Sequence, residues 1–140
     1  MSSAQHNLAS NDRADRVRRS TASEINSRID RQTDDNIQRF RSRSENEIRE
    51  RIEELDREWD VERMLEVNAS TLALSGLVLG LTVSRKWFLL PGIVLPFLLQ
   101  HGIQGWCPPL SILRRQGIRT RGEIDREKFA LLSELDSQTR

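Results

Sequence analysis

Residues 67–106 read VNASTLALSGLVLGLTVSRKWFLLPGIVLPFLLQHGIQGW and hold two apolar runs, Val67 to Ser84 and Trp87 to Trp106. Only Arg85 and Lys86 separate the runs, and neither run contains a charged residue. At about 1.5 Å per helical residue, each run is long enough to cross a hydrocarbon core about 30 Å thick, the first only just. The sequence therefore predicts an all-α membrane protein built on a two-span transmembrane helical hairpin over 67–106.

The rest of the chain is strongly polar. Charged residues make up 31% of the 140 residues, and the formal net charge of +1 gives no overall attraction to nucleic acid. The single cysteine, Cys107, excludes an intrachain disulfide. Residues 1–20 have almost no apolar content, which predicts a disordered tail without a signal peptide. The first apolar run is then expected to act as its own insertion signal.

Residues 21–66 are predicted to form a charged, amphipathic helical arm. No Gly or Pro precedes Gly76, which favours helix. An apolar stripe recurs with a mean step of about 3.8 residues, a period that gives paired helices a right-handed or nearly straight coiled coil. The stripe consists of Ile25, Ile29, Ile37, Phe40, Ile48, Ile52, Leu55 and Trp59, with Thr33 and Ser44 in the same phase.

The last four stripe residues are the predicted contact face of the arm: Ile48, Ile52, Leu55 and Trp59. A charged helix with such a stripe is unstable alone in water. Another copy of the arm, a partner protein or the membrane surface could cover it. Ser44 and Glu47 have the spacing of a capping box, which predicts that the strong part of the helix begins at Ser44.

Small residues in the first span form a second candidate interface. Ala73, Gly76 and Gly80 recur at helical spacing, and the two glycines make a GxxxG pair. Such residues let helix backbones approach closely in lipid, either within one hairpin or between chains. In the second span, Pro91 and Pro96 predict a kink or a broken first turn.

Residues at the membrane boundary are predicted from aromatic and basic side chains. Trp87 and Trp106 bracket the second span about 28 Å apart, close to the hydrocarbon thickness. Residues 107–122 form a basic juxtamembrane segment that contains no acid. Two partners fit it, an anionic lipid surface and the acidic helix over 44–66. Its arginines are Arg114, Arg115, Arg119 and Arg121.

A C-terminal helix is predicted over 123–140. Thr120 and Glu123 have capping-box spacing at its start. Its apolar side is expected to carry Ile124, Leu131, Leu132 and Leu135.

Little in the sequence indicates chemistry. Cys107 is a small apolar residue at a span end, a redox or persulfide-handling thiol, or a site of lipidation or interchain pairing. His101 is a polar residue near the same end, six positions before Cys107 and therefore on a different helical face. We expect no catalytic residue, no metal site and no cofactor.

Residues from about Glu62 to Thr120 resemble the YgaP-like transmembrane family of bacterial inner-membrane hairpins. The matching positions are Arg63, Asn68, Gly76, Gly80, the block Gly105-Trp106-Cys107-Pro108, and Gly117 to Thr120. The resemblance implies a bacterial inner-membrane hairpin that can dimerise through its helices, with Cys107 at the family's Cys-Pro position. Some family members carry a rhodanese sulfurtransferase domain, for which this chain has no room, so no catalysis is carried over.

The positive charges near the span ends predict the orientation. Arg85 and Lys86 lie at the hairpin tip, and more arginines flank the other side, which places both termini in the cytoplasm. We therefore expect a non-enzymatic, multi-pass structural or assembly protein of the bacterial inner membrane, in contact with anionic lipids. It would self-associate or join a membrane complex. The alternatives are an accessory of sulfur or redox enzymes acting through Cys107 and a membrane-shaping hairpin.

Overall fold

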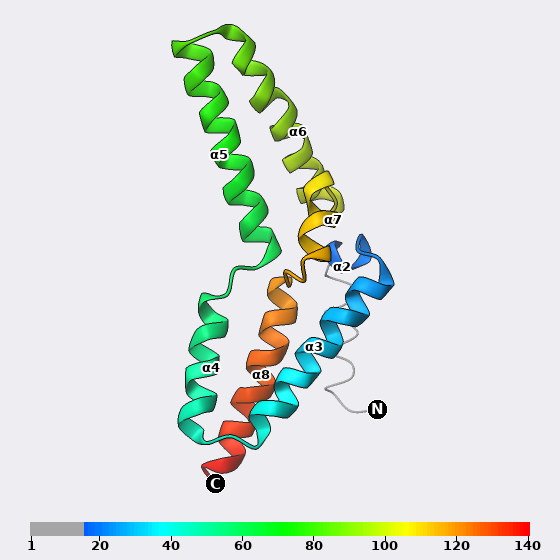
Figure 1. Cartoon of the computed structure of the whole chain (residues 1–140), viewed down its shortest axis with the longest axis vertical. Helices are drawn as coiled ribbons and strands as arrows, with labels where there is room; N and C mark the ends of the chain where they lie inside the picture. Colours follow the sequence, from blue (N-terminus) through cyan, green and yellow to red (C-terminus); the bar gives the residue numbers. More distant parts are fainter. Residues whose placement is uncertain (1–15) are drawn as a thin grey trace.

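The computed structural model describes residues 16–140, and every regular element in that range is helical (Figure 1). The antiparallel pair α5–α6 occupies one end of the structure, α3, α4 and α8 occupy the other, and α2 and α7 lie between them (Figure 1). The elements are α2 (Arg16–Arg19), α3 (Ser23–Arg41), α4 (Glu45–Arg57), α5 (Val61–Thr82), a 3₁₀ turn η1 (Arg85–Phe88), α6 (Leu89–Gln104), α7 (Pro108–Arg115) and α8 (Arg121–Gln138).

The two apolar runs form α5 and α6, with the η1 turn at their tip. Two helical segments, one ending at Thr82 and one over Arg85–Gln104, are long and apolar enough to cross a membrane. The pair packs closely because Gly76 faces the start of α6 and Gly80 faces the η1 turn. A Cβ atom at Gly76 would lie only 2.5 Å from Cδ of Pro91, and one at Gly80 would lie 2.8 Å from the Phe88 ring.

The predicted helical arm over 21–66 is divided among α3, α4 and the first turns of α5, so the helix expected over 44–66 ends at Arg57 and a new one begins at Val61. Ser44 has an extended backbone (φ −66°, ψ 156°) and forms a capping box with Glu47, so a new helix begins there. Local capping energy outweighs helix propensity at this point. The chain reverses, and α3 and α4 run antiparallel (Figure 1). Asp60 then caps α5 by accepting a hydrogen bond from the Arg63 amide at 2.7 Å.

Helix α8 covers both arm helices and completes a three-helix bundle. Its residues Ile124, Leu131 and Leu135 pack with Ile48 and Leu55 of α4 in one buried cluster. The cover of the apolar stripe is therefore the chain's own C-terminal helix, and the expected cover by another arm, a partner or the membrane is wrong for these positions. Thr120 and Glu123 form the predicted capping box at the start of α8.

A second core lies where the bundle meets the α5–α6 pair. It contains Val17 of α2, Val61 and Leu65 of α5, Cys107, and Leu110 of α7. The predicted disordered tail is thus wrong for residues 16–20, where α2 packs against the junction. Residues 1–15 of that predicted tail lie outside the described residues.

Candidate functional site

The junction between the bundle and the α5–α6 pair holds a buried cluster of charged side chains. Arg114, the second-last residue of α7, is 0% exposed. Its guanidinium donates hydrogen bonds to the two carboxylate oxygens of Glu123, at 2.7 and 2.8 Å. It also donates to the Ile118 carbonyl at 3.1 Å, to Asn26 at 2.7 Å and to Thr21 at 3.2 Å. Arg114 therefore ties α7 to α8, to α3 and to the turn that follows α2.

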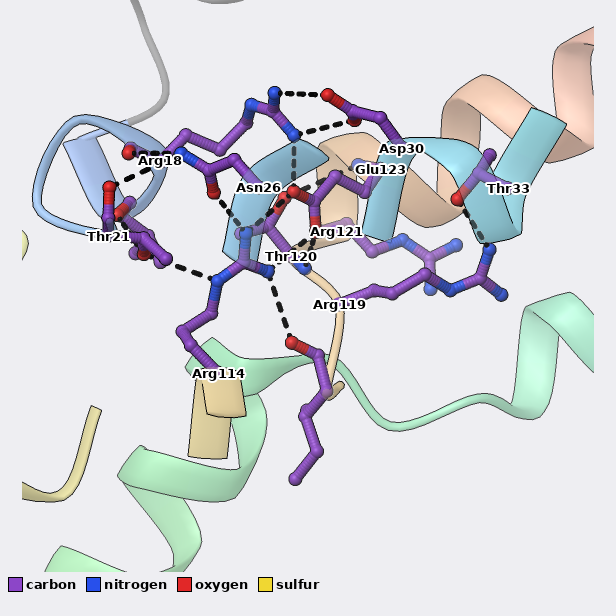
Figure 2. Close-up of polar contacts among 12 residues, drawn as sticks. Arg18, Thr21, Asn26, Asp30, Thr33, Arg114, Arg119, Thr120, Arg121 and Glu123 are labelled. Atoms are coloured by element: carbon purple, nitrogen blue, oxygen red, sulfur yellow. Dashed lines mark hydrogen bonds and ion pairs between the residues drawn. The ribbon is translucent and has the colours of Figure 1, made fainter. Parts of the chain in front are cut away.

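Glu123 also forms an ion pair with a second arginine, Arg18 of α2. Figure 2 shows Arg18 and Arg114 converging on Glu123, and the Arg18 contact measures 2.5 Å. Arg18 also donates to both oxygens of Asp30, each at 2.9 Å. Burial alone would raise the pKa of Glu123, but hydrogen bonds and charge from Arg114, the Thr120 amide and Arg18 outweigh it and hold this pKa below its ordinary value.

A parallel cluster one turn along α8 joins the two arm helices. Glu127 is fully buried and pairs with Arg119 and with Arg51 of α4, the latter at 3.0 Å. Arg119 also forms a bidentate pair with Glu58, at 2.9 and 2.5 Å. Burial alone would lower the pKa of Arg119, yet its bonds to Glu58 and Glu127 raise it. Charged side chains from α4, from α8 and from the loop between α7 and α8 thus fill the part of the bundle core nearest the junction.

These clusters have the chemistry of structural ion pairs. The carboxylates of Glu123 and Glu127 each contact two guanidinium groups, so both are neutralised in place. A general acid or base needs a pKa near the operating pH and access to substrate, and the lowered pKa of buried Glu123 provides neither. Among residues 16–140, no group of three or more His, Cys, Asp and Glu side chains is placed to hold a metal ion.

Cys107 directly precedes α7, and its backbone is extended (φ −152°, ψ 161°). Its side chain is only 4% exposed and lies in the junction core. Burial raises the pKa of the Cys107 thiol, so the reactive thiolate is disfavoured at neutral pH. His101, in the last turns of α6, is half-buried, and its Nδ1 atom has no hydrogen-bond partner within the described residues.

The structure corrects two of the four predicted lipid-contacting arginines. Arg114 and Arg119 are buried in the ion-pair clusters and face no lipid. The acidic helix over 44–66 was the other expected partner of these arginines. Arg119 does form an ion pair with Glu58, directly after α4, within the same chain. Arg121 pairs with Asp125 at 3.0 Å, and Arg115 is exposed. Trp87 and Trp106 are both exposed, and their placement at a lipid boundary stays a prediction.

Most residues of the predicted oligomer interface have contacts within the same chain. Ile48 and Leu55 are fully buried under α8, so they are not available to a second chain. Ile52 is partly buried beside them, while Trp59 stays 46% exposed, with the Arg63 guanidinium 4.5 Å from its ring centroid. Gly76 faces α6 and Gly80 faces Phe88 of the η1 turn, both within the same chain, which is the intramolecular alternative. Ala73, one turn before them, is half-buried.

Sequence reasoning missed most residues of the buried clusters, namely Arg18, Asn26, Arg51, Glu58, Glu123 as an ion-pair partner, and Glu127. Arginine and glutamate lie at the surface in most proteins, so composition gives no hint of their burial. A positional signal does exist in α8. Glu127 lies three residues after Ile124 and four before Leu131, which places it within the apolar stripe of the helix.

Comparisons of the chain with family models, with curated proteins and with solved structures give no match. The resemblance to YgaP-like hairpins over residues 62–120 therefore stays a prediction. What can be concluded about function rests on the geometry of the chain itself.

Proposed function

We propose that this chain is a non-enzymatic, multi-pass protein of the bacterial inner membrane. In this proposal α5 and α6 cross the bilayer as a hairpin, and the α3–α4–α8 bundle lies at the cytoplasmic face as a module for assembly. The bundle would dock on a membrane complex or on a second copy of the chain.

One observation carries the membrane part of the proposal. The outward sides of α5 and α6 consist of large apolar side chains that no other element covers, next to a bundle whose charges are largely paired internally. Monomeric soluble proteins rarely expose apolar surface on this scale. The exposed side chains are Val67, Leu72, Leu74, Leu77, Val78, Leu81, Leu89, Ile93, Leu95, Phe97, Leu99 and Ile103.

The ion-pair clusters support the role of the bundle. Arg114 and Arg18 link α7 and α2 to Glu123 of α8, so the bundle is held to the base of the hairpin by buried bonds. Such a bundle moves with its membrane anchor as one unit. Buried charge pairs of this kind favour one specific arrangement over looser apolar alternatives in several systems, which suits a docking module.

The surface left for docking follows from the packing. With Ile48 and Leu55 under α8, the exposed apolar side chains of the bundle are Phe129 (65% exposed) and Leu132 (40%) of α8. They lie three residues apart, on one side of the helix. A chain that assembles through its bundle would use these two residues.

The sulfur or redox alternative receives no support at Cys107. A thiol that is 4% exposed, with a raised pKa and no cation bound to it in the described residues, lacks the features of a reactive cysteine. The membrane-shaping alternative stays a prediction.

Extraction of membranes with alkaline carbonate tests the membrane part of the proposal. Val78→Asp places a carboxylate near the centre of the first span, which costs about 2.5–3.5 kcal/mol for insertion. We expect this variant to lose its carbonate-resistant membrane fraction. Phe129→Asp, a matched exposed apolar-to-acid change in the bundle, should stay in the membrane pellet. Release of the wild-type chain by carbonate, or equal behaviour of the two variants, would contradict the proposal.

A further inference from the structure

Arginines in this structure differ in their partners. Those in the bundle clusters are paired with acids, as described above. Four others surround the base of α6 and α7 and form no ion pair with any acid within residues 16–140. We call them the basal arginines; they are Arg16, Arg19, Arg28 and Arg115, and all four are exposed.

Main-chain contacts place Arg16 at the end of α6 and Arg28 at the end of α7. Arg16 of α2 donates to the Gly102 carbonyl of α6 at 2.8 Å, and Arg28 of α3 donates to the Arg115 carbonyl at the end of α7 at 2.6 Å. The absence of a side chain at Gly105 permits this approach, because a Cβ atom there would lie 2.5 Å from Cβ of Arg16. Gly105 also has φ +74°, the left-handed conformation that ends α6.

The height of Arg16 along the hairpin is specific. Gly102 lies four residues before Trp106, so the Arg16 guanidinium reaches about 6 Å into the second apolar run. In the proposed membrane arrangement this is the boundary between hydrocarbon and headgroups. A guanidinium without an anion is costly at that depth. The planar guanidinium fork matches the geometry of a phosphate group.

Apolar and acidic neighbours of the basal arginines agree with a headgroup surface. Trp106 and Ile112 are exposed beside them and provide side chains that can enter the acyl boundary. Exposed acids on the neighbouring elements, such as Glu24 of α3 and Glu66 of α5, form no ion pair with any of the four. The surface therefore keeps an excess of positive charge.

We propose that the basal arginines bind the phosphate groups of anionic phospholipids in the cytoplasmic leaflet. This inference rests on the proposed function, since it needs α6 in a bilayer. It replaces the lipid contact expected at Arg114 and Arg119, and it gives α2 a role that the sequence did not indicate. The lipid phosphate accepts hydrogen bonds from Arg16 and holds α2 and α7 at the membrane surface.

The test uses the full chain, purified in a neutral detergent and titrated with phosphatidylglycerol or phosphatidylcholine while the midpoint of thermal unfolding is followed. Arg19→Gln with Arg115→Gln removes two basal charges whose side chains make no hydrogen bond in the described structure, so the fold is retained. The control is Arg31→Gln with Arg39→Gln, two exposed α3 arginines that also lack an ion pair within residues 16–140.

We expect phosphatidylglycerol to raise the midpoint more than phosphatidylcholine does. The basal pair of substitutions should raise the phosphatidylglycerol concentration needed for half of the shift at least fivefold, because each surface arginine contributes about 1 kcal/mol, a factor of about five. The control pair should leave it unchanged.

Three results would overturn the inference: equal shifts with the two lipids, equal effects of the basal and control pairs, or a full shift with inorganic phosphate alone. Carbonate extraction from vesicles of pure phosphatidylcholine separates this inference from the proposed function. A chain that inserts into these vesicles but shows equal shifts with the two lipids refutes only the lipid site, whereas a chain that fails to insert refutes the membrane anchor.

Discussion

At the scale of single residues, Arg114 illustrates how this chain keeps a charge in its interior. Desolvating a guanidinium costs several kcal/mol, and only close pairing with full hydrogen bonding offsets that cost. Arg114 makes five hydrogen bonds, to Glu123 twice and to Ile118, Asn26 and Thr21. The arrangement is intolerant of losing one partner, because the remaining charge would stay buried.

Because Glu123 can be protonated, the stability that this cluster provides depends on pH. Its pKa in the folded chain lies below the ordinary value of 4.5, so the ionised carboxylate favours the folded state. The resulting stability is fully present above pH 4.5 and is lost as the pH falls through the folded-state value. Glu123→Gln should lower the thermal midpoint at neutral pH and flatten the loss of stability below pH 4.5, in circular dichroism melts of the detergent-solubilised protein.

The control for this prediction is Glu50→Gln, which makes the same change on an exposed side chain that forms no ion pair within the described range. Its melts should follow the wild type at every pH. A Glu123→Gln protein with an unchanged acid limb would show that other carboxylates govern the acid unfolding.

At the scale of elements, the α5–α6 pair depends on a close backbone approach at Gly76. A side chain there would meet Pro91 and the Trp87 carbonyl, which belong to a rigid ring and to the backbone. Gly76→Leu should therefore separate the helices and lower stability by about 1–3 kcal/mol, the range found for overpacked sites. Thermal aggregation of the detergent-solubilised protein measures this effect.

Gly92 of α6 is the matched control, since a Cβ atom there meets nothing within 4 Å. Gly92→Leu should leave the aggregation midpoint near that of the wild type. If Gly76→Leu behaves in the same way as Gly92→Leu, the close packing of the pair is wrong.

Helix α8 offers a second matched pair in two adjacent leucines. Leu131 is fully buried against α4, whereas Leu132 is 40% exposed. Leu131→Ala should lower the free energy of unfolding of the bundle by about 2–5 kcal/mol, through lost burial and the cavity left behind. Leu132→Ala should cost much less. Denaturant titration followed by helical circular dichroism distinguishes the two, and similar losses would mean that α8 does not cover α4 as described.

The boundaries of these elements show what local sequence can predict. The capping boxes at Ser44–Glu47 and Thr120–Glu123 depend on residues three apart, and both form as expected. The sequence predicts the helix start at Ser44, but it does not predict the end of α4 at Arg57, inside the helix expected over 44–66. The apolar stripe keeps its phase from Ile48 to Trp59, past that end, and so gives no sign of it.

At the scale of the whole molecule, the all-helical fold and the two long apolar helices are predictable because periodicity and run length carry them. The element that covers the stripe cannot be predicted in this way, because the sequence around Ile48 and Leu55 is the same whether α8 or another chain covers them. The ion-pair clusters are the least predictable part. Arg18 and Glu123 are 105 residues apart, and no spacing in the sequence indicates that they meet.

The central claim is that α5 and α6 cross a membrane and leave the bundle on its cytoplasmic side. Single cysteines can test it in a Cys107→Ala background, with Lys86→Cys at the hairpin tip and Ser137→Cys at the exposed end of α8. A membrane-impermeant maleimide applied to intact bacterial cells that express each variant should label Lys86→Cys. It should label Ser137→Cys only after the membrane is permeabilised. Labelling of Ser137→Cys in intact cells, or a tip cysteine that is reached only after permeabilisation, would contradict the account.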